Sequence, residues 1–259
     1  MKNKKLSSIA LLLLLPLLLS ACGSENSLPT VAEPPEDSTS PPSSALLGET
    51  EDFGQSYLDS FVFFGESTTY HLKNRGVLKG GTETKQVWGP DGGTVNLDGT
   101  IGSLVIRYPE TEELLTLSQA LSRKKPSYLL LCFGLNGAPQ KLRGGAEAYK
   151  KCYRLLLDTV KQSSPETKVI LQSAFPVAEN MDMSAYSMTL DQLNGAIETI
   201  NGWTLELAEE YGMKYLNTAE ILKDEQGRLH MEYQSGDGYH LTREAYLLIL
   251  RYIRTHGWK

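Results

Sequence analysis

Cysteine is scarce in this chain of 259 residues, which holds only three, and histidine, with four, is almost as rare. Cys132 and Cys152 lie in apolar stretches and lack metal-ligand spacing, so we expect two buried free thiols rather than a disulfide. No cluster of basic residues stands out, and the net charge is −6. These absences argue against a zinc centre and against a nucleic-acid partner.

A long hydrophobic run is confined to the N-terminus, where lysines precede an almost unbroken apolar stretch from Ile9 to Leu19. That stretch is too short for a good membrane-spanning helix. Small residues then lead into Cys22 as Leu-Ser-Ala-Cys, which resembles a bacterial lipobox. We interpret residues 1–21 as a lipoprotein signal peptide and Cys22 as the lipidated first residue of an extracytoplasmic, membrane-anchored protein. An ordinary signal peptide or an uncleaved anchor is the alternative.

Lysine and arginine are absent from residues 23–50, which are rich in proline, serine and acidic side chains. Such a composition cannot bury enough apolar surface to offset the entropy of ordering. We therefore predict that residues 22–50 form a disordered tether that follows the lipid anchor. Residues 51–259 are long enough for one domain with a sizeable core.

Short apolar runs alternate with longer amphipathic stretches throughout this domain. Strands are predicted at residues 61–64, 86–88, 128–133, 168–175 and 213–217, and helices at about 149–160, 190–211 and 243–255. Apolar strands separated by helices predict a three-layer α/β/α domain with a parallel sheet of about five strands. Residues 89–115 are poorly patterned, and residues 177–188 are predicted to form a long loop.

Ligands of such a sheet bind beyond the carboxyl ends of its strands. Ser67 follows the first strand directly and is a candidate nucleophile, which requires a base within hydrogen-bond reach. Asp237 precedes His240 by three residues, so its carboxylate can accept the Nδ1 proton and leave Nε2 free for Ser67. His71 is the rival base, but it lacks an acid at suitable spacing, and we interpret it as a surface or pocket-wall residue. Taken singly, a helix-capping serine and a polar surface loop would explain the same residues.

An ester-cleaving serine also needs hydrogen-bond donors for the developing oxyanion. The amide of Ser67 at a helix start is one candidate, and the side chain of Asn136, after the third strand, is another. A backbone amide of Gly93, or of its neighbour Gly92, is the third. Asn136-Gly137 is equally a favoured turn dipeptide.

Three segments together resemble the SGNH hydrolases, also called GDSL-type esterases: Gly65-Glu66-Ser67, Gly134-Leu135-Asn136 and Asp237-Gly238-Tyr239-His240. The resemblance extends from about residue 60 to 245 and implies a flavodoxin-like α/β/α sandwich. It implies Ser67 as nucleophile, Asn136 and a glycine as oxyanion donors, and His240 as base oriented by Asp237. We assign the glycine to Gly93.

The sequence departs from the family pattern at three positions. Glu66 replaces the usual aspartate, Thr68 the leucine that often follows the serine, and Gly137 a second aspartate. No catalytic atom is lost, so we expect the changes to affect the supports that position the loops. The Gly-x-Ser-x-Gly elbow of the α/β-hydrolases is absent.

The expected function is a serine ester hydrolase that needs no metal or cofactor. Its expected substrates are O-acetylated cell-wall or extracellular glycans, or other small acyl esters. The loop at residues 177–188, which carries Tyr186, either lines the acyl or sugar site or is only a surface loop. The main alternative is a non-catalytic module that binds a glycan or a partner. A solute-binding lipoprotein is disfavoured, because two hinged lobes would need more strands than this domain supplies.

Overall fold

The computed structural model describes residues 43–259, so the predicted signal peptide, Cys22 and the tether up to residue 42 lie outside the described residues. Residues 43–50, assigned to the tether by composition, belong to the domain. Ala45 and Leu47 are buried, and both pair with Tyr215 through backbone hydrogen bonds of 2.8 and 2.9 Å. The predicted boundary at residue 51 is therefore wrong, because an Ala-Leu-Leu run at the end of the polar stretch supplies side chains that the core buries.

A parallel sheet of five strands forms the centre of the domain, in the order β2-β1-β5-β6-β7. The strands are β1 (Phe61–Gly65), β2 (Val87–Trp88), β5 (Tyr128–Cys132), β6 (Lys168–Gln172) and β7 (Lys214–Leu216). Their order is that of a flavodoxin-like doubly wound sheet. The predicted fold class is confirmed, and the strand ends differ from the predicted ones by a few residues.

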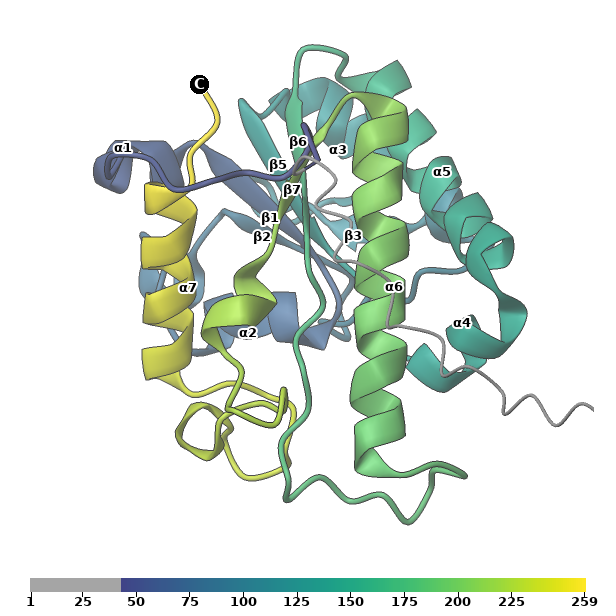
Figure 1. Ribbon diagram of the computed structural model, residues 1–259. Helices are drawn as coiled ribbons and strands as arrows, with labels where there is room; N and C mark the ends of the chain where they lie inside the picture. The colour runs from purple at the N-terminus through teal and green to yellow at the C-terminus, as the bar shows by residue number, and fades with distance from the viewer. Residues whose placement is uncertain (1–42) are drawn as a thin grey trace, which may run out of the picture. The chain divides into compact units, whose positions relative to one another are not determined.

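Helices cover both faces of this sheet, as Figure 1 shows. One face carries α1 (Gly54–Asp59), α2 (Ser67–Asn74) and α7 (Arg243–Thr255), and the other carries α3 (Leu117–Lys124), α5 (Ala146–Ser163) and α6 (Leu190–Tyr211). Alternate side chains of one strand enter different cores: Phe61 and Phe63 pack with α7, and Val62 and Phe64 with α5. A strand buried on both faces must be apolar throughout, which explains the unbroken Phe-Val-Phe-Phe run.

Capping residues define both ends of the long helix α6. Thr189 caps it by accepting from the Gln192 amide, and the Gln192 side chain accepts in return from the Thr189 amide. Gly212, in the left-handed region with φ of 63°, ends it. Gly195 and Gly202 lie inside the helix without interrupting it.

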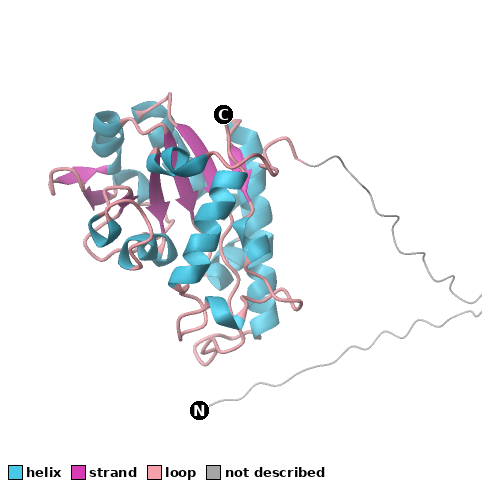
Figure 2. Cartoon of the chain, turned by 90° about the vertical axis from the view of Figure 1, so that its left-hand side faces the viewer, coloured by secondary structure: helices cyan, strands magenta, loops and turns pink. Residues whose placement is uncertain are grey.

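The poorly patterned region between β2 and α3 contains only short elements. A 3₁₀ turn, η2 (Ile101–Ser103), precedes two antiparallel strands, β3 (Val105–Arg107) and β4 (Leu114–Thr116). This pair is a separate small sheet, which Figure 2 shows beside the main one. Three-residue strands are too short to produce a readable alternation, so the sequence did not predict them.

The remaining elements are the helix α4 (Ala138–Gly144) and three 3₁₀ turns, η1 (Gly81–Glu83), η3 (Thr218–Ile221) and η4 (Met231–Tyr233). Residues 177–188 form a loop without helix or strand, as predicted. Cys132 is buried and Cys152 half-buried, and both are free thiols. Within residues 43–259, no helix is long and apolar enough to cross a membrane.

Candidate active site

Ser67 lies where β1 ends and α2 begins, at the carboxyl edge of the sheet. The turn depends on Gly65, since a Cβ there would lie 2.3 Å from the Cys132 carbonyl oxygen and 2.4 Å from Thr69 Oγ1. Only glycine allows β1 to approach β5 so closely just before the serine. As the first residue of α2, Ser67 has a backbone amide without an acceptor in the preceding turn of its own helix.

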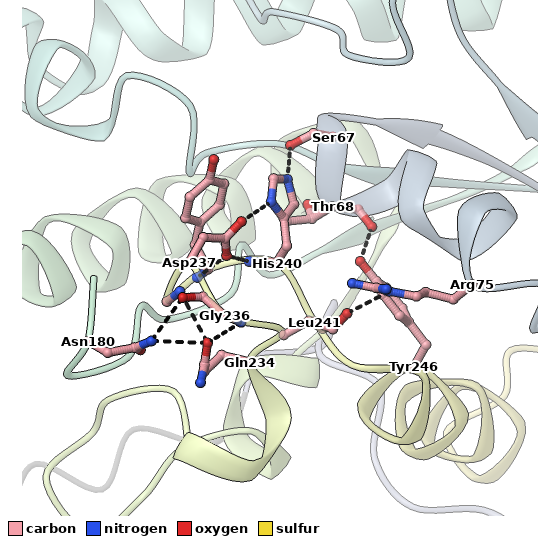
Figure 3. Close-up of polar contacts among 12 residues, drawn as sticks. Ser67, Thr68, Arg75, Asn180, Gln234, Gly236, Asp237, His240, Leu241 and Tyr246 are labelled. Carbon is pink, nitrogen blue, oxygen red and sulfur yellow. Dashed lines mark hydrogen bonds and ion pairs between the residues drawn. The ribbon is translucent and has the colours of Figure 1, made fainter. Parts of the chain in front are cut away.

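His240 and Asp237 meet Ser67 in a chain of hydrogen bonds (Figure 3). His240 Nε2 lies 3.0 Å from Ser67 Oγ, and His240 Nδ1 lies 2.6 Å from Asp237 Oδ2. Because an ionised carboxylate only accepts, Nδ1 carries the proton and Nε2 is free to accept from the serine hydroxyl. The imidazole is 15% exposed and the carboxylate 43%, so the ring of His240 is shielded while Asp237 contacts solvent.

Asp237 also organises the backbone of its own loop. Its Oδ1 accepts from the amides of Tyr239, at 3.1 Å, and His240, at 2.9 Å. Burial acts to raise the pKa of Asp237, but the hydrogen bonds from His240 and Tyr239 outweigh it and lower the pKa below its usual range. The carboxylate is therefore ionised at neutral pH, as the orienting group of a histidine base must be.

Two neighbouring side chains hold the rest of this loop in place (Figure 3). Gln234 Oε1 accepts from the amides of Gly236 and Gly238, at 2.6 and 3.3 Å, and the side-chain amide of Asn180 donates to the same oxygen. Gly238 has a φ of 86°, and a Cβ there would lie 2.6 Å from the Met181 backbone. The loop bearing His240 thus packs closely against the loop at residues 177–188.

Glu66, immediately before the serine, is buried and binds the loop that follows β5. Its carboxylate accepts from the amides of Gly134 at 3.1 Å, Leu135 at 3.0 Å and Asn136 at 2.9 Å. Burial raises the pKa of Glu66, against the lowering by Lys141 and the three amides. The carboxylate therefore fixes the Asn136 loop beside Ser67.

The two predicted oxyanion donors differ in their surroundings. The Asn136 side-chain amide donates to Thr94 Oγ1 at 3.3 Å, so it faces the segment after β2. Gly93, with a φ of 70°, packs on the ring of Tyr70, where a Cβ would lie 2.7 Å from ring carbons. Its amide donates to the Pro90 carbonyl in a turn, at 2.9 Å. The role of Gly93 as an oxyanion donor stays a prediction.

The ring of His71 packs against the ring of the predicted base, His240. The rings of His71 and His240 stack with centroids 4.1 Å apart and an interplanar angle of 22°. Burial lowers the pKa of His71 to about 4, with smaller contributions from His240 and Arg75. The ring is thus neutral at pH 7, and its Nδ1 has no hydrogen-bond partner among the described residues. His71 therefore contacts the ring of His240.

A comparison with protein families agrees with this arrangement of segments. The profile of the GDSL-like Lipase/Acylhydrolase family matches residues 63–248, which cover most of the described domain. The chain belongs to the GDSL-like lipase/acylhydrolase family. The match begins within β1 and ends within α7, so it contains every predicted residue of the serine, histidine and aspartate set.

Solved structures similar to this family member share low sequence identity with it. A Streptococcus pneumonia protein described as a platelet activating factor is 17% identical over 75% of this chain and 82% of its own, with a TM-score of 0.48. The periplasmic domain of a Salmonella ser. Paratyphi A lipopolysaccharide acetyltransferase is 15% identical over 75% and 82%, with a TM-score of 0.49. A peptidoglycan O-acetylesterase is 12% identical over 53% and 37%, with a TM-score of 0.39. No curated protein matches the sequence.

A surface pocket of about 310 Å³, here called a hollow, lies beside Asn136 in this GDSL-like domain. Its lining is polar and apolar in about equal parts, and comes from Leu135, Asn136, Gly137, Met181, Tyr186, Leu193 and Tyr239. A second hollow of about 420 Å³ shares Gly137 and Tyr186 with it and adds the polar side chains of Gln140 and Arg143. A larger hollow, of about 510 Å³, lies at the amino ends of β1 and β5 and contains no predicted site residue.

Sequence reasoning missed two residues that shape this site, Lys141 and Thr94, and the stacking of His71 on His240. Thr94 contacts Asn136 from the poorly patterned segment after β2, and Lys141 contacts it from α4, a helix that was not predicted. No motif signals either contact. The position of His71 one turn after Ser67 placed it near the site, but spacing could not show that its ring would stack on His240.

Proposed function

We propose that this protein is an extracytoplasmic serine ester hydrolase, with Ser67 as nucleophile, His240 as general base and Asp237 as the orienting acid. The observation that carries the proposal is the pair of hydrogen bonds that joins Ser67 Oγ to His240 Nε2 at 3.0 Å and His240 Nδ1 to Asp237 Oδ2 at 2.6 Å. This arrangement provides what a serine hydroxyl needs to become a nucleophile at neutral pH, namely an oriented neutral base within hydrogen-bond reach.

In the first half-reaction, Ser67 Oγ attacks the ester carbonyl carbon while its proton moves to His240 Nε2. The imidazolium that forms is stabilised by the ionised carboxylate of Asp237. The carbonyl oxygen becomes an oxyanion, which accepts from the Ser67 amide at the start of α2, from Asn136 Nδ2 and from a backbone amide near Gly93. Asn136 Nδ2 turns from Thr94 Oγ1 to the oxyanion in this step.

Collapse of the intermediate breaks the bond to the leaving oxygen, which takes the proton from His240 and departs as the alcohol. Ser67 is left acylated. A water molecule then gives its proton to His240 and attacks the acyl carbon, and the second intermediate releases the acid as Ser67 Oγ recovers its proton. The residues named above supply every proton transfer.

The hollow beside Asn136 supports a substrate with a compact ring or acyl group next to the ester. Tyr186 and Tyr239 offer aromatic faces of the kind that sugar rings pack against, and the outer hollow adds polar groups from Gln140 and Arg143. We propose O-acetylated glycans, or other small acyl esters, as substrates. In this proposal the loop at residues 177–188 lines the site.

The experiment measures kcat for the hydrolysis of p-nitrophenyl acetate by a protein of residues 43–259 and by its Ser67→Ala variant. The expected loss in kcat is at least about a thousandfold. Ser56→Ala, an exposed serine on α1, is the matched control and should keep full activity. Equal activity of the wild type and Ser67→Ala would refute Ser67 as the nucleophile. Absence of activity in the wild type, with acetylated glycans tested as well, would favour the non-catalytic binding module.

The location is tested separately with the full chain. We propose that Cys22 carries a lipid that anchors the protein outside the cytoplasm. The full chain should then sediment with membranes, and its Cys22→Ser variant should be released in soluble form. Sedimentation of both proteins would refute the anchor at Cys22.

A further inference from the structure

The loop that carries Asn136 is bound by two groups of opposite charge, the buried Glu66 and the largely shielded Lys141. Glu66 accepts from three successive amides of this loop, at 2.9–3.1 Å. Lys141, in the second turn of α4, lies 3.8 Å from Glu66 Oε1, measured from its Nζ. The side chains of Glu66 and Lys141 are 2% and 14% exposed. An ion pair so well shielded is not an ordinary surface contact.

Lys141 also reaches the loop itself, because its Nζ donates to the backbone carbonyl of Asn136. The amide of Asn136 donates to Glu66, so both sides of this residue's main chain are held by charged groups. Charge-assisted hydrogen bonds are about twice as strong as neutral ones. The backbone of Asn136 therefore has little freedom to rotate.

Gly137 lies beside this lysine. Its φ of 68° is in the left-handed region that favours glycine, and a Cβ added there would lie 3.9 Å from Lys141 Nζ, an ordinary contact. A carboxylate at position 137, where the family usually has aspartate, would offer the ammonium another partner. The two departures from the family pattern, Glu66 and Gly137, therefore both border Lys141.

We propose that Lys141 is a positioning residue, which together with Glu66 fixes Asn136 so that its side-chain amide can reach the oxyanion. The inference rests on the proposed function. Lys141 does not touch the substrate. Its contribution is that Asn136 needs only a side-chain rotation, with no movement of the main chain, to donate to the oxyanion.

The test is a double-mutant cycle on the kinetics of p-nitrophenyl acetate hydrolysis, with Lys141→Met and Asn136→Ala. Lys141→Met should lower kcat about 10- to 50-fold and change KM less than about threefold. In the Asn136→Ala background the same substitution should have almost no further effect, because the group that it positions is gone. Lys151→Met, an exposed lysine on α5, is the matched control and should keep the wild-type rate.

A second variant separates positioning from simple stabilisation. Lys141→Met alone leaves the Glu66 carboxylate buried without its counter-ion and destabilises the fold. Glu66→Gln/Lys141→Met removes both charges, so its thermal unfolding should return towards that of the wild type while kcat stays low. This double variant replaces Lys141→Met in the cycle if the single variant does not fold.

Three results would overturn the inference: an unchanged kcat in Lys141→Met, the same fold-loss with and without Asn136, or recovery of kcat together with stability in the double variant. The last two would make Lys141 a structural counter-ion only. Failure of the proposed function itself looks different, since the wild type would then be inactive or Ser67→Ala fully active.

Discussion

Two loops meet at Ser67, and they are held by different means. The loop at residues 234–240, which carries the proposed base, is fixed mainly by its own side chains: Asp237 and Gln234 bind amides two to four residues away. The loop at residues 134–136, which carries the proposed oxyanion donor, is fixed by Glu66, about 70 positions earlier in the chain, and by Lys141 on α4. One loop is locally stabilised and partly exposed, and the other depends mainly on the buried carboxylate of Glu66, which comes from a distant part of the chain.

This difference predicts how well each loop tolerates the loss of a stabilising hydrogen bond. Local hydrogen bonds on an exposed loop are each worth about 1 kcal/mol and can be replaced by water, so the base loop should tolerate loss of a support. A buried carboxylate that satisfies three amides has no such replacement, because water does not reach it. The oxyanion loop should therefore be the more fragile, although its catalytic contribution is the smaller.

The largest effect is expected from the base itself. His240→Gln removes the proton acceptor while keeping a side chain of similar reach, and kcat/KM should fall about 10³- to 10⁴-fold. Steady-state kinetics with p-nitrophenyl acetate measure this fall in kcat/KM. A loss below tenfold would mean that another group acts as base, and His71→Gln would then be the variant to compare.

The next effect is expected from the oxyanion donor. Asn136→Ala removes one donor and should lower kcat about 10²-fold with little change in KM. Its thermal unfolding should match that of the wild type, since within residues 43–259 Asn136 Nδ2 makes only one long hydrogen bond, to Thr94 Oγ1 at 3.3 Å. A rate equal to that of the wild type would show that Asn136 is a turn residue and no more.

A smaller effect is expected when a local support of the base loop is removed. Gln234→Ala leaves the amides of Gly236 and Gly238 to solvent, and kcat should fall only about three- to tenfold. Glu66→Gln is the matching variant at the other loop and should cost clearly more in both kcat and melting temperature. If Gln234→Ala proves the more damaging of the two, the contrast between the loops is wrong.

The smallest effect on activity is expected at His71, where the consequence is a change in pH-dependent stability. The pKa of His71 is lowered from 6.5 to about 4 by burial, so the unfolded state binds more protons between these values and stability is lost as the pH falls below 6.5. His71→Phe keeps a ring against His240 but has no titration. From pH 7 to pH 5 the wild type should lose about 1 kcal/mol more than this variant, after allowance for its partial exposure.

Urea unfolding at the two pH values measures this difference. The control is His230→Phe, an exposed histidine outside the site, which should follow the wild type. Parallel loss of stability in the wild type and His71→Phe would contradict a neutral, half-buried His71. At pH 7, kcat/KM of His71→Phe should stay within about threefold of the wild type.

The contrast between the loops also explains what could be predicted from the sequence. The five strands were predictable because each is an apolar run, and the Asp237–His240 pair because it lies within one loop. The partners of the loop at residues 134–136 were not predictable, since Glu66 between β1 and α2, Thr94 in the segment after β2 and Lys141 on α4 come together only in the folded chain. The start of the domain was misplaced because composition averages over residues 22–50 and hides the short Ala-Leu-Leu run that packs beside β7.

The central claim is that Ser67 is a nucleophile made reactive by His240. The most direct test is the intact mass of residues 43–259 after treatment with diisopropyl fluorophosphate, followed by peptide mapping. The account predicts one phosphoryl adduct, located on Ser67, absent in Ser67→Ala and formed at least about 100-fold more slowly in His240→Gln. An adduct on another residue, or none in a protein that hydrolyses p-nitrophenyl acetate, would contradict it.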